Sequence, residues 1–158
     1  MGETKSIERI QSAHPKLRAK MLAAYQEAVK ATPVGVHPFI DEVLRSFKRS
    51  DELYSQGRTK PGPIVTNAPG GSSLHNYGLA CDFHLQINGK DVWPNNFRAD
   101  KNWMKVVEIF KKHGFTWGGD FKSIVDAPHF EMTFGYSTKQ LLALYKAGKV
   151  DKDGYVLI

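Results

Sequence analysis

The fold of this chain is decided by the stretch Ser73-Leu74-His75-Asn76-Tyr77-Gly78-Leu79-Ala80-Cys81-Asp82. It places an imidazole and a carboxylate seven positions apart, with a glycine between them that lets the chain turn tightly. A second stretch adds another imidazole and a further carboxylate: Asp126-Ala127-Pro128-His129-Phe130-Glu131. Together the two stretches offer two nitrogen ligands, one oxygen ligand and a spare acid, which is the inventory of a catalytic zinc site.

Both stretches lie in segments where apolar and polar side chains alternate, as they do in strands with one buried face. Asp82 lies on the polar face of a predicted strand over residues 79–85, and His129 lies on the polar face of another over residues 129–134. If these strands are neighbours in one antiparallel sheet, both side chains can project from the same face. His75 can then reach in from the preceding loop, so the alternation places three possible ligands together.

Residue chemistry alone leaves two interpretations open. Asp126 lies three residues before His129, close enough to stand beside a metal without binding it. A single histidine or aspartate in a strand, however, is more often a surface or hydrogen-bonded residue, and spacing cannot identify three dispersed ligands. Four further histidines compete as ligands: His14, His37, His84 and His113. Of these, His84 shares the polar face with Asp82 and could support the site from outside the ligand set.

The remaining sequence predicts helices and a further strand around this centre. The pattern predicts helices over residues 15–30, 46–56, 100–113 and 138–147, and a strand over residues 36–44. Asp100 is the expected cap of the third helix, and Asn88-Gly89 is a hairpin signal. Because there are no repeats and no linker, the 158 residues suit one domain with a single core.

Composition narrows the class of protein. Hydrophobic content of 41% and charged content of 24% are ordinary for a soluble globular protein, and no apolar run is long enough to span a bilayer. Because the first residues lack the apolar stretch of a secretory signal, we expect synthesis in the cytoplasm. The single cysteine, Cys81, excludes an internal disulfide and a cysteine-rich zinc site, so any metal must be held by histidine and carboxylate.

The net charge of +6 favours binding to polyanions, which include nucleic acid and an anionic cell envelope. The lysines and arginines are scattered, however, and no basic run is interleaved with aromatic residues. The charge therefore predicts solubility or loose attraction and not a specific nucleic-acid site.

Several motifs, in order along the chain, resemble those of the M15 zinc peptidases. Three carry the candidate site: Ser-x-His-x-x-Gly-x-Ala-x-Asp over residues 73–82, Trp-Gly-Gly-Asp-Phe over 117–121 and Asp-x-x-His-Phe-Glu over 126–131. Residues 44–47, 51–62 and 64–71 resemble the L-alanyl-D-glutamate endopeptidase subgroup, which contains phage endolysins and bacterial cell-wall hydrolases. The resemblance covers residues 36–134.

The resemblance implies a role for six residues at matching positions. It implies zinc binding by His75, Asp82 and His129, acid–base catalysis by Asp126, substrate binding and oxyanion stabilisation by Arg45, and substrate binding by Ser73. Two positions depart from the pattern. Ser50 stands where close relatives often carry Gln, and Val43-Leu44 precede the arginine where relatives often have Gly and an aromatic residue. Substrate contacts near Ser50 are therefore left open.

The resemblance also implies an α+β fold of the small hedgehog/D-Ala-D-Ala-peptidase type, with a central antiparallel sheet flanked by helices. Residues 1–158 would form one zinc peptidase domain, with the motifs in residues 36–134. The implied activity is zinc-dependent cleavage of the L-alanyl-D-glutamate bond in the peptidoglycan stem peptide, as by an endolysin in host cell lysis. We expect a monomer made in the cytoplasm that acts on the cell wall after release, without a nucleic-acid partner or stable membrane insertion.

Three alternatives remain at this point. Within the family, the chain could be a D-alanyl-D-alanine carboxypeptidase or dipeptidase. A non-catalytic zinc-binding relative with the hedgehog fold would not need Asp126 and Arg45. A nucleic-acid or envelope-binding module that uses the +6 charge would not require His75, Asp82 and His129 together.

Overall fold

The computed structural model describes residues 2–158. Its helices are α1 (Gly2–Ile10), α2 (Pro15–Ala31), α3 (Phe47–Ser55), α4 (Lys101–Lys112) and α5 (Thr138–Lys146). Its strands are β1 (Val36–Glu42), β2 (Ala80–Ile87), β3 (Lys90–Val92), β4 (Thr116–Trp117) and β5 (His129–Glu131). Short 3₁₀ helices cover Leu74–Tyr77, Phe97–Ala99 and Gly118–Asp120. None of the helices described combines the length and the apolar character that crossing a bilayer requires.

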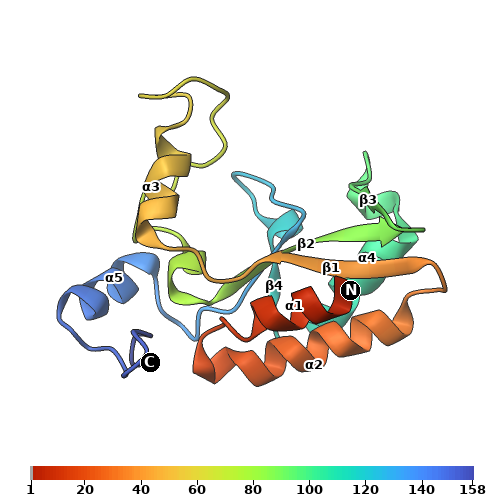
Figure 1. Ribbon diagram of the computed structural model, residues 1–158, viewed down its shortest axis with the longest axis horizontal. Coiled ribbons are helices and arrows are strands. Elements are labelled where there is room, and N and C mark those ends of the chain that lie inside the picture. The colour runs from red at the N-terminus through yellow and green to blue at the C-terminus, as the bar shows by residue number, and fades with distance from the viewer. Residues whose placement is uncertain (1) are drawn as a thin grey trace.

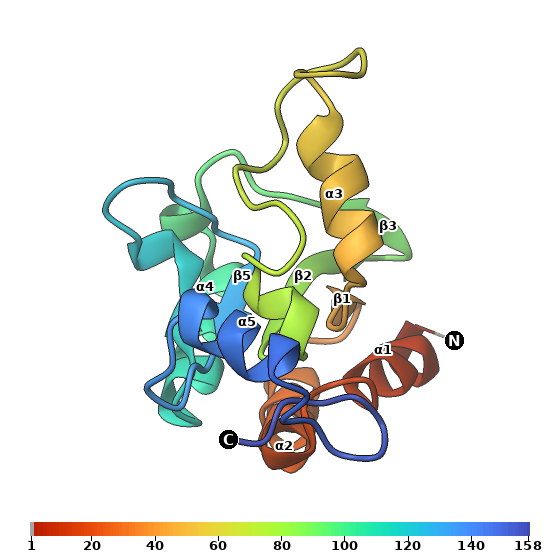
Figure 2. The same cartoon turned by 90° about the vertical axis from the view of Figure 1, so that its left-hand side faces the viewer.

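The strands form one antiparallel sheet in the order β1-β2-β5-β4, and β3 pairs with the end of β2. Figure 1 shows α1 and α2 below the sheet, whereas α3 and the loop after it rise on the opposite side. Figure 2, turned by 90°, shows the same layers and places the C-terminus beside α2. The side of the sheet next to α3 is therefore the side available for a site.

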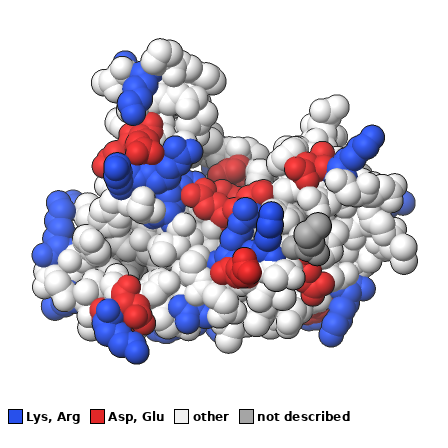
Figure 3. Space-filling model, in the orientation of Figure 1, with Lys and Arg blue, Asp and Glu red and all other residues white. Residues whose placement is uncertain are grey.

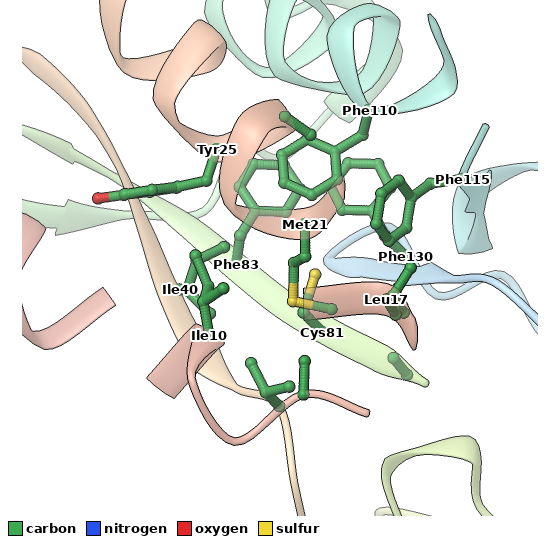
Figure 4. Packing of buried hydrophobic residues seen from close by; sticks show 14 of the residues in the cluster. Ile10, Leu17, Met21, Tyr25, Ile40, Cys81, Phe83, Phe110, Phe115 and Phe130 are labelled. Atoms are coloured by element: carbon green, nitrogen blue, oxygen red, sulfur yellow. The ribbon is translucent and has the colours of Figure 1, made fainter. Parts of the chain in front are cut away.

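The apolar face of the sheet packs against α2 and α4 (Figure 4). Phe83 of β2 and Phe130 of β5 are fully buried, and their ring centroids lie 5.1 Å apart in a stacked arrangement. Phe110 of α4 stacks on Phe130 at 4.3 Å, and Met21 of α2 lies in the same cluster. Because truncating a buried phenylalanine typically costs about 3–5 kcal/mol, this core holds β2 and β5 firmly. It thereby fixes the residues on their opposite faces.

Helix α1 covers the free edge of β1, which has β2 on one side only. The Ile40 amide donates to the Ser6 hydroxyl at 3.0 Å, and the Arg9 guanidinium donates to the Ile40 carbonyl at 2.7 Å. An uncovered edge strand would offer such backbone groups to other chains. The helix therefore closes this edge of the sheet.

A β-bulge interrupts β1 at Asp41. The register between β1 and β2 shifts between Ile40 and Glu42, so Asp41 is an extra residue on β1. Asp41 and Glu42 consequently both line the polar side of the sheet, whereas Ile40 and Val43 are both buried in the core. The strand predicted over residues 36–44 is shorter than expected because its regular pairing ends here.

The helices predicted from the sequence agree with α2, α3, α4 and α5, and the Asn88-Gly89 hairpin joins β2 to β3 as predicted. The Asp100 carboxylate caps α4 by accepting the Trp103 amide at 2.8 Å. The strand predicted over residues 129–134 was too long, since β5 ends at Glu131. Phe134 has a φ of 50°, in the left-handed region, so the extended backbone of the strand does not continue to this residue.

Candidate active site

Three side chains converge on the polar face of the sheet: His75, Asp82 and His129. Asp82 and His129 are directly paired residues of β2 and β5, and His75 lies in the 3₁₀ helix that leads into β2. His75 Nε2 lies 3.3 Å from one oxygen of Asp82, and His129 Nδ1 lies 3.1 Å from the other. One potential ligand atom from each residue lies within 4.8 Å of the others, which suits a single metal ion. The sheet thus brings together the three residues that the family resemblance implied as ligands and that the alternation allowed to share one face.

The hydrogen bonds of both imidazoles turn one nitrogen toward this meeting point. His75 Nδ1 lies 2.9 Å from the Val43 carbonyl, which only accepts, so Nδ1 carries the proton and Nε2 faces Asp82. His129 Nε2 lies 2.9 Å from the Glu131 carboxylate, so Nδ1 faces Asp82. Two imidazole nitrogens and one carboxylate oxygen are the donor set of catalytic zinc sites. The residues therefore fit zinc.

The same contacts shift the pKa values of these groups. Burial raises the pKa of Asp82, but the hydrogen bonds from His129 and His75 outweigh it and hold the pKa well below its usual range. Burial lowers the pKa of His129, yet the hydrogen bonds to Asp82 and Glu131 raise it to about 9. Without metal, the pair at neutral pH is therefore a carboxylate beside an imidazolium.

His75 is held by the loop before β2. The Ser73 hydroxyl accepts the His75 amide at 3.2 Å, and the Arg45 amide donates to the His75 carbonyl at 2.9 Å. Gly78 ends the 3₁₀ helix with a φ of 66°, and a Cβ there would lie 2.6 Å from the His14 backbone nitrogen. Ser73, expected to bind substrate, lines the cleft, but the hydrogen bond it makes caps the helix that carries His75.

Asn76 has a supporting role that the sequence did not reveal. Its Oδ1 accepts the amides of Gly71 at 3.0 Å and Ser73 at 3.2 Å. Its Nδ2 donates to the Ser50 hydroxyl at 2.9 Å and to the Arg45 carbonyl at 3.0 Å. Ser50, at which the sequence left substrate contacts open, is fully buried and supports the loop through Asn76.

Asp126 stands beside the three residues. Its Oδ2 lies 3.9 Å from His129 Nδ1. The Asp126 amide donates to the Gly118 carbonyl at 2.9 Å, and the Trp117 indole donates to the Ala127 carbonyl at 2.6 Å. Because a Cβ at Gly118 would overlap the Asp126 carbonyl, this turn needs glycine to position the acid. Burial raises the pKa of Asp126 above its usual value and outweighs the opposing effect of His129, which suits a group that must take up a proton.

Arg45 reaches the cleft from the segment between β1 and α3. Its Nε and Nη2 donate to the two oxygens of Glu42 at 2.8 and 2.5 Å, which is a two-pronged ion pair. This pairing raises the pKa of Arg45 and holds its guanidinium against the cleft wall. Glu42 was not among the predicted site residues. The available signal was its position three residues before the arginine.

These side chains line a cleft of about 1050 Å³ between α3 and the polar face of the sheet. The cleft carries five carboxylates, those of Asp41, Glu42, Asp82, Asp126 and Glu131. Arg45 and Arg49 stand on the α3 side. Figure 3 shows this division, with red carboxylates in the hollow and blue basic side chains beside it below α3. The cleft therefore offers both charges to a peptide.

Comparison with known proteins identifies the family. Residues 66–132 match the M15 peptidase family model described as D-alanyl-D-alanine carboxypeptidase. Over 113 residues the chain is 51% identical to the peptidoglycan L-alanyl-D-glutamate endopeptidase CwlK of Bacillus subtilis (strain 168), and the match covers 67% of this chain and 68% of CwlK. The chain belongs to the M15 peptidase family.

Two further matches are named for the same bond. The L-alanyl-D-glutamate peptidase of Listeria phage A118 is 37% identical over 91 residues, which cover 54% of this chain and 32% of the phage protein. The crystal structure of the Serratia marcescens L-Ala D-Glu endopeptidase ChiX matches 82% of this chain and 86% of its own, with a TM-score of 0.58 and 23% identity. That likeness confirms the predicted α+β fold. M15 peptidases are in general zinc-dependent, in agreement with the donor set found here.

The other histidines of this M15 peptidase are held elsewhere. His84 is buried between Asp41, 2.8 Å from its Nδ1, and Asp91, 3.0 Å from its Nε2. The remaining three have other partners: Val156 for His14, Tyr25 for His37 and Glu27 for His113. Within residues 2–158 none of the four joins the three-residue group. The structure therefore does not place His84 against the ligands, because both its ring nitrogens bind other carboxylates.

We expect the affinity of the chain for zinc to fall as the pH falls below about 9. A zinc ligand must be a neutral imidazole, whereas His129 in the metal-free protein holds its extra proton up to a pKa of about 9. Below this value the affinity for zinc should fall ~10-fold for each unit by which the pH decreases. Titration calorimetry in buffers of different ionisation enthalpy would measure the proton released. Zinc binding that does not vary with pH would contradict the expectation.

Proposed function

We propose that the chain is a zinc-dependent peptidoglycan endopeptidase that cleaves the L-alanyl-D-glutamate bond of the stem peptide. The observation that carries the proposal is the convergence of His75, Asp82 and His129, beside Asp126, in a chain that is 51% identical to an enzyme named for that reaction. The three residues would hold zinc and leave a fourth position for water. A zinc ion in such a site supplies Lewis acidity, which polarises a carbonyl and acidifies a water.

Two residues of the chain handle the proton and the charge. Asp126 takes a proton from the attacking water as the water oxygen bonds to the carbonyl carbon. It delivers that proton to the nitrogen as the carbon–nitrogen bond breaks. Arg45, which is always charged, donates to the developing oxyanion or to a nearby substrate carboxylate. The carboxylate of Glu42 holds the guanidinium in place for this contact.

The form of the cleft favours an endopeptidase. The stem peptide of an endopeptidase substrate continues on both sides of the bond, so the cleft must be open along its length. Figure 3 shows the hollow open at the surface beside α3. The alternative, a D-alanyl-D-alanine carboxypeptidase or dipeptidase, is favoured by the description of the matching family model. Such an enzyme must recognise a terminus of its substrate peptide.

Digestion of purified peptidoglycan tests the proposal. We expect mass spectrometry to find new N-terminal D-glutamate, with L-alanine left on the muramyl side. The same preparation treated with a chelator should be inactive and should recover when zinc is returned. Release of free D-alanine or D-Ala-D-Ala, without a new glutamyl amine, would move the protein to the alternative.

We also propose that the enzyme is endolysin-like, accumulating in the cytoplasm and reaching the wall through a separate membrane lesion. The phage relative and the charge of +6, which favours an anionic envelope, support this. Binding to cell walls should then weaken from low to high salt, because exposed charges are screened beyond ~10 Å at 0.1 M. Sedimentation with purified cell walls measures the bound fraction at each salt concentration. Binding that does not depend on salt would contradict the electrostatic account.

A further inference from the structure

Glu131 borders the site through its contact with His129 but belongs neither to the three-residue group nor to the residues that move the proton. It lies two residues after His129 on β5, so the two side chains share one face of the strand. Its backbone is fixed on both sides, since Glu131 is registered with Ala80 of β2 and with Thr116 of β4. Its side chain is 19% exposed and lines the cleft. The carboxylate therefore belongs to a rigid part of the site.

The carboxylate of Glu131 contacts the far side of the His129 ring. Its Oε2 lies 2.9 Å from Nε2, whereas Nδ1 is the nitrogen that faces Asp82 at 3.1 Å. Within residues 2–158, the group of atoms able to share a metal contains His129 but not Glu131. A metal on Nδ1 would leave this contact intact, because the proton on Nε2 remains available for donation.

We propose that Glu131 is a positioning residue of the metal site: by accepting the Nε2 proton of His129, it keeps Nδ1 turned toward His75 and Asp82. An imidazole can offer either nitrogen, and the hydrogen bond to one decides which is left for a metal. The inference rests on the proposed zinc site. The two histidines are oriented by different groups: a side-chain carboxylate accepts the proton of His129, whereas the backbone carbonyl of Val43, 2.9 Å from Nδ1, accepts that of His75.

The test is the dissociation constant for zinc, measured by competition with a chromophoric chelator. Loss of a carboxylate that orients a ligating histidine typically costs 10–100-fold in metal affinity, so we expect ~10–100-fold weaker binding for Glu131→Ala. Glu131→Gln keeps an oxygen that can accept the Nε2 proton and should stay near the parent. In the Co²⁺-substituted protein, the visible absorption should change for the Ala variant and be restored for Gln.

Glu42→Ala is the matched control. It removes one carboxylate from the same cleft, but Glu42 pairs with Arg45 and does not contact His129. Its zinc affinity should remain within a few-fold of the parent. The role of Glu131 would be overturned if Glu131→Ala bound zinc as tightly as the parent. It would also be overturned if Glu131→Gln or Glu42→Ala lost as much zinc affinity as Glu131→Ala. A parent chain without zinc affinity would instead overturn the proposed zinc site, and this inference with it.

Discussion

Asp126→Asn is expected to bind zinc like the parent and to lose peptidoglycan hydrolysis by ~10²–10⁴-fold, the usual contribution of general acid–base catalysis. The amide can neither accept the proton of the attacking water nor return one to the leaving amine. The substitution should leave the zinc site in place because Asp126 lies 3.9 Å from His129 and is not part of the three-residue group. Initial rates at equal zinc content measure the effect.

Asp120→Asn is the control for this substitution. Asp120 belongs to the same turn region but pairs with Arg98 and Lys111 and does not line the cleft. Its activity should stay close to that of the parent. If Asp126→Asn retained activity within a few-fold at full zinc content, another group would have to move the proton.

His75→Ala is expected to lose zinc and, with it, all measurable hydrolysis. It removes one of three ligands, so the loss of affinity should exceed the ~10–100-fold that follows from removing a supporting residue alone. The helix that carries His75 is also held by Ser73 and Gly78, so the loop should keep its conformation in the variant. Elemental analysis after dialysis, together with a chelator titration, measures the zinc bound.

His113→Ala provides the comparison for His75→Ala. His113 ends α4 and contacts Glu27, far from the ligands in the sheet, so its removal should leave zinc stoichiometry unchanged. An unchanged stoichiometry in His75→Ala would contradict the assignment of this ligand. Equal loss in both variants would indicate a general destabilisation.

The side chains of β2 and β5 that face the site could be predicted because that signal is local, whereas the pairing of the two strands, 47 positions apart at Asp82 and His129, was assumed as a condition. Alternation along β2 and β5 fixed which side chains share a face, and the structure pairs Asp82 directly with His129. The His75 loop was predictable for the same reason, since the glycine that ends it is next to the residues it serves. The approach of Asp126 was predictable in part, because three residues separate it from His129.

The parts that escaped prediction depend on contacts between distant segments. Helix α1 has nine residues, and its two isoleucines, Ile7 and Ile10, are too few to predict a helix from their spacing alone. The helix is stabilised by its contacts with β1, which cannot be predicted from the sequence of the first ten residues. Asn76 was missed likewise, because its partner Ser50 lies 26 positions earlier in the chain.

The bulge at Asp41 adds a carboxylate to the cleft without changing the faces of the residues around it. Deleting Asp41 would restore a regular ladder and would leave Glu42 on the cleft side and Val43 in the core, because Glu42 is already the residue opposite Asp82. The ion pair between Glu42 and Arg45 would be kept, whereas His84 would lose the carboxylate at its Nδ1. The cleft can therefore lose the bulge residue and still keep the partner of its arginine.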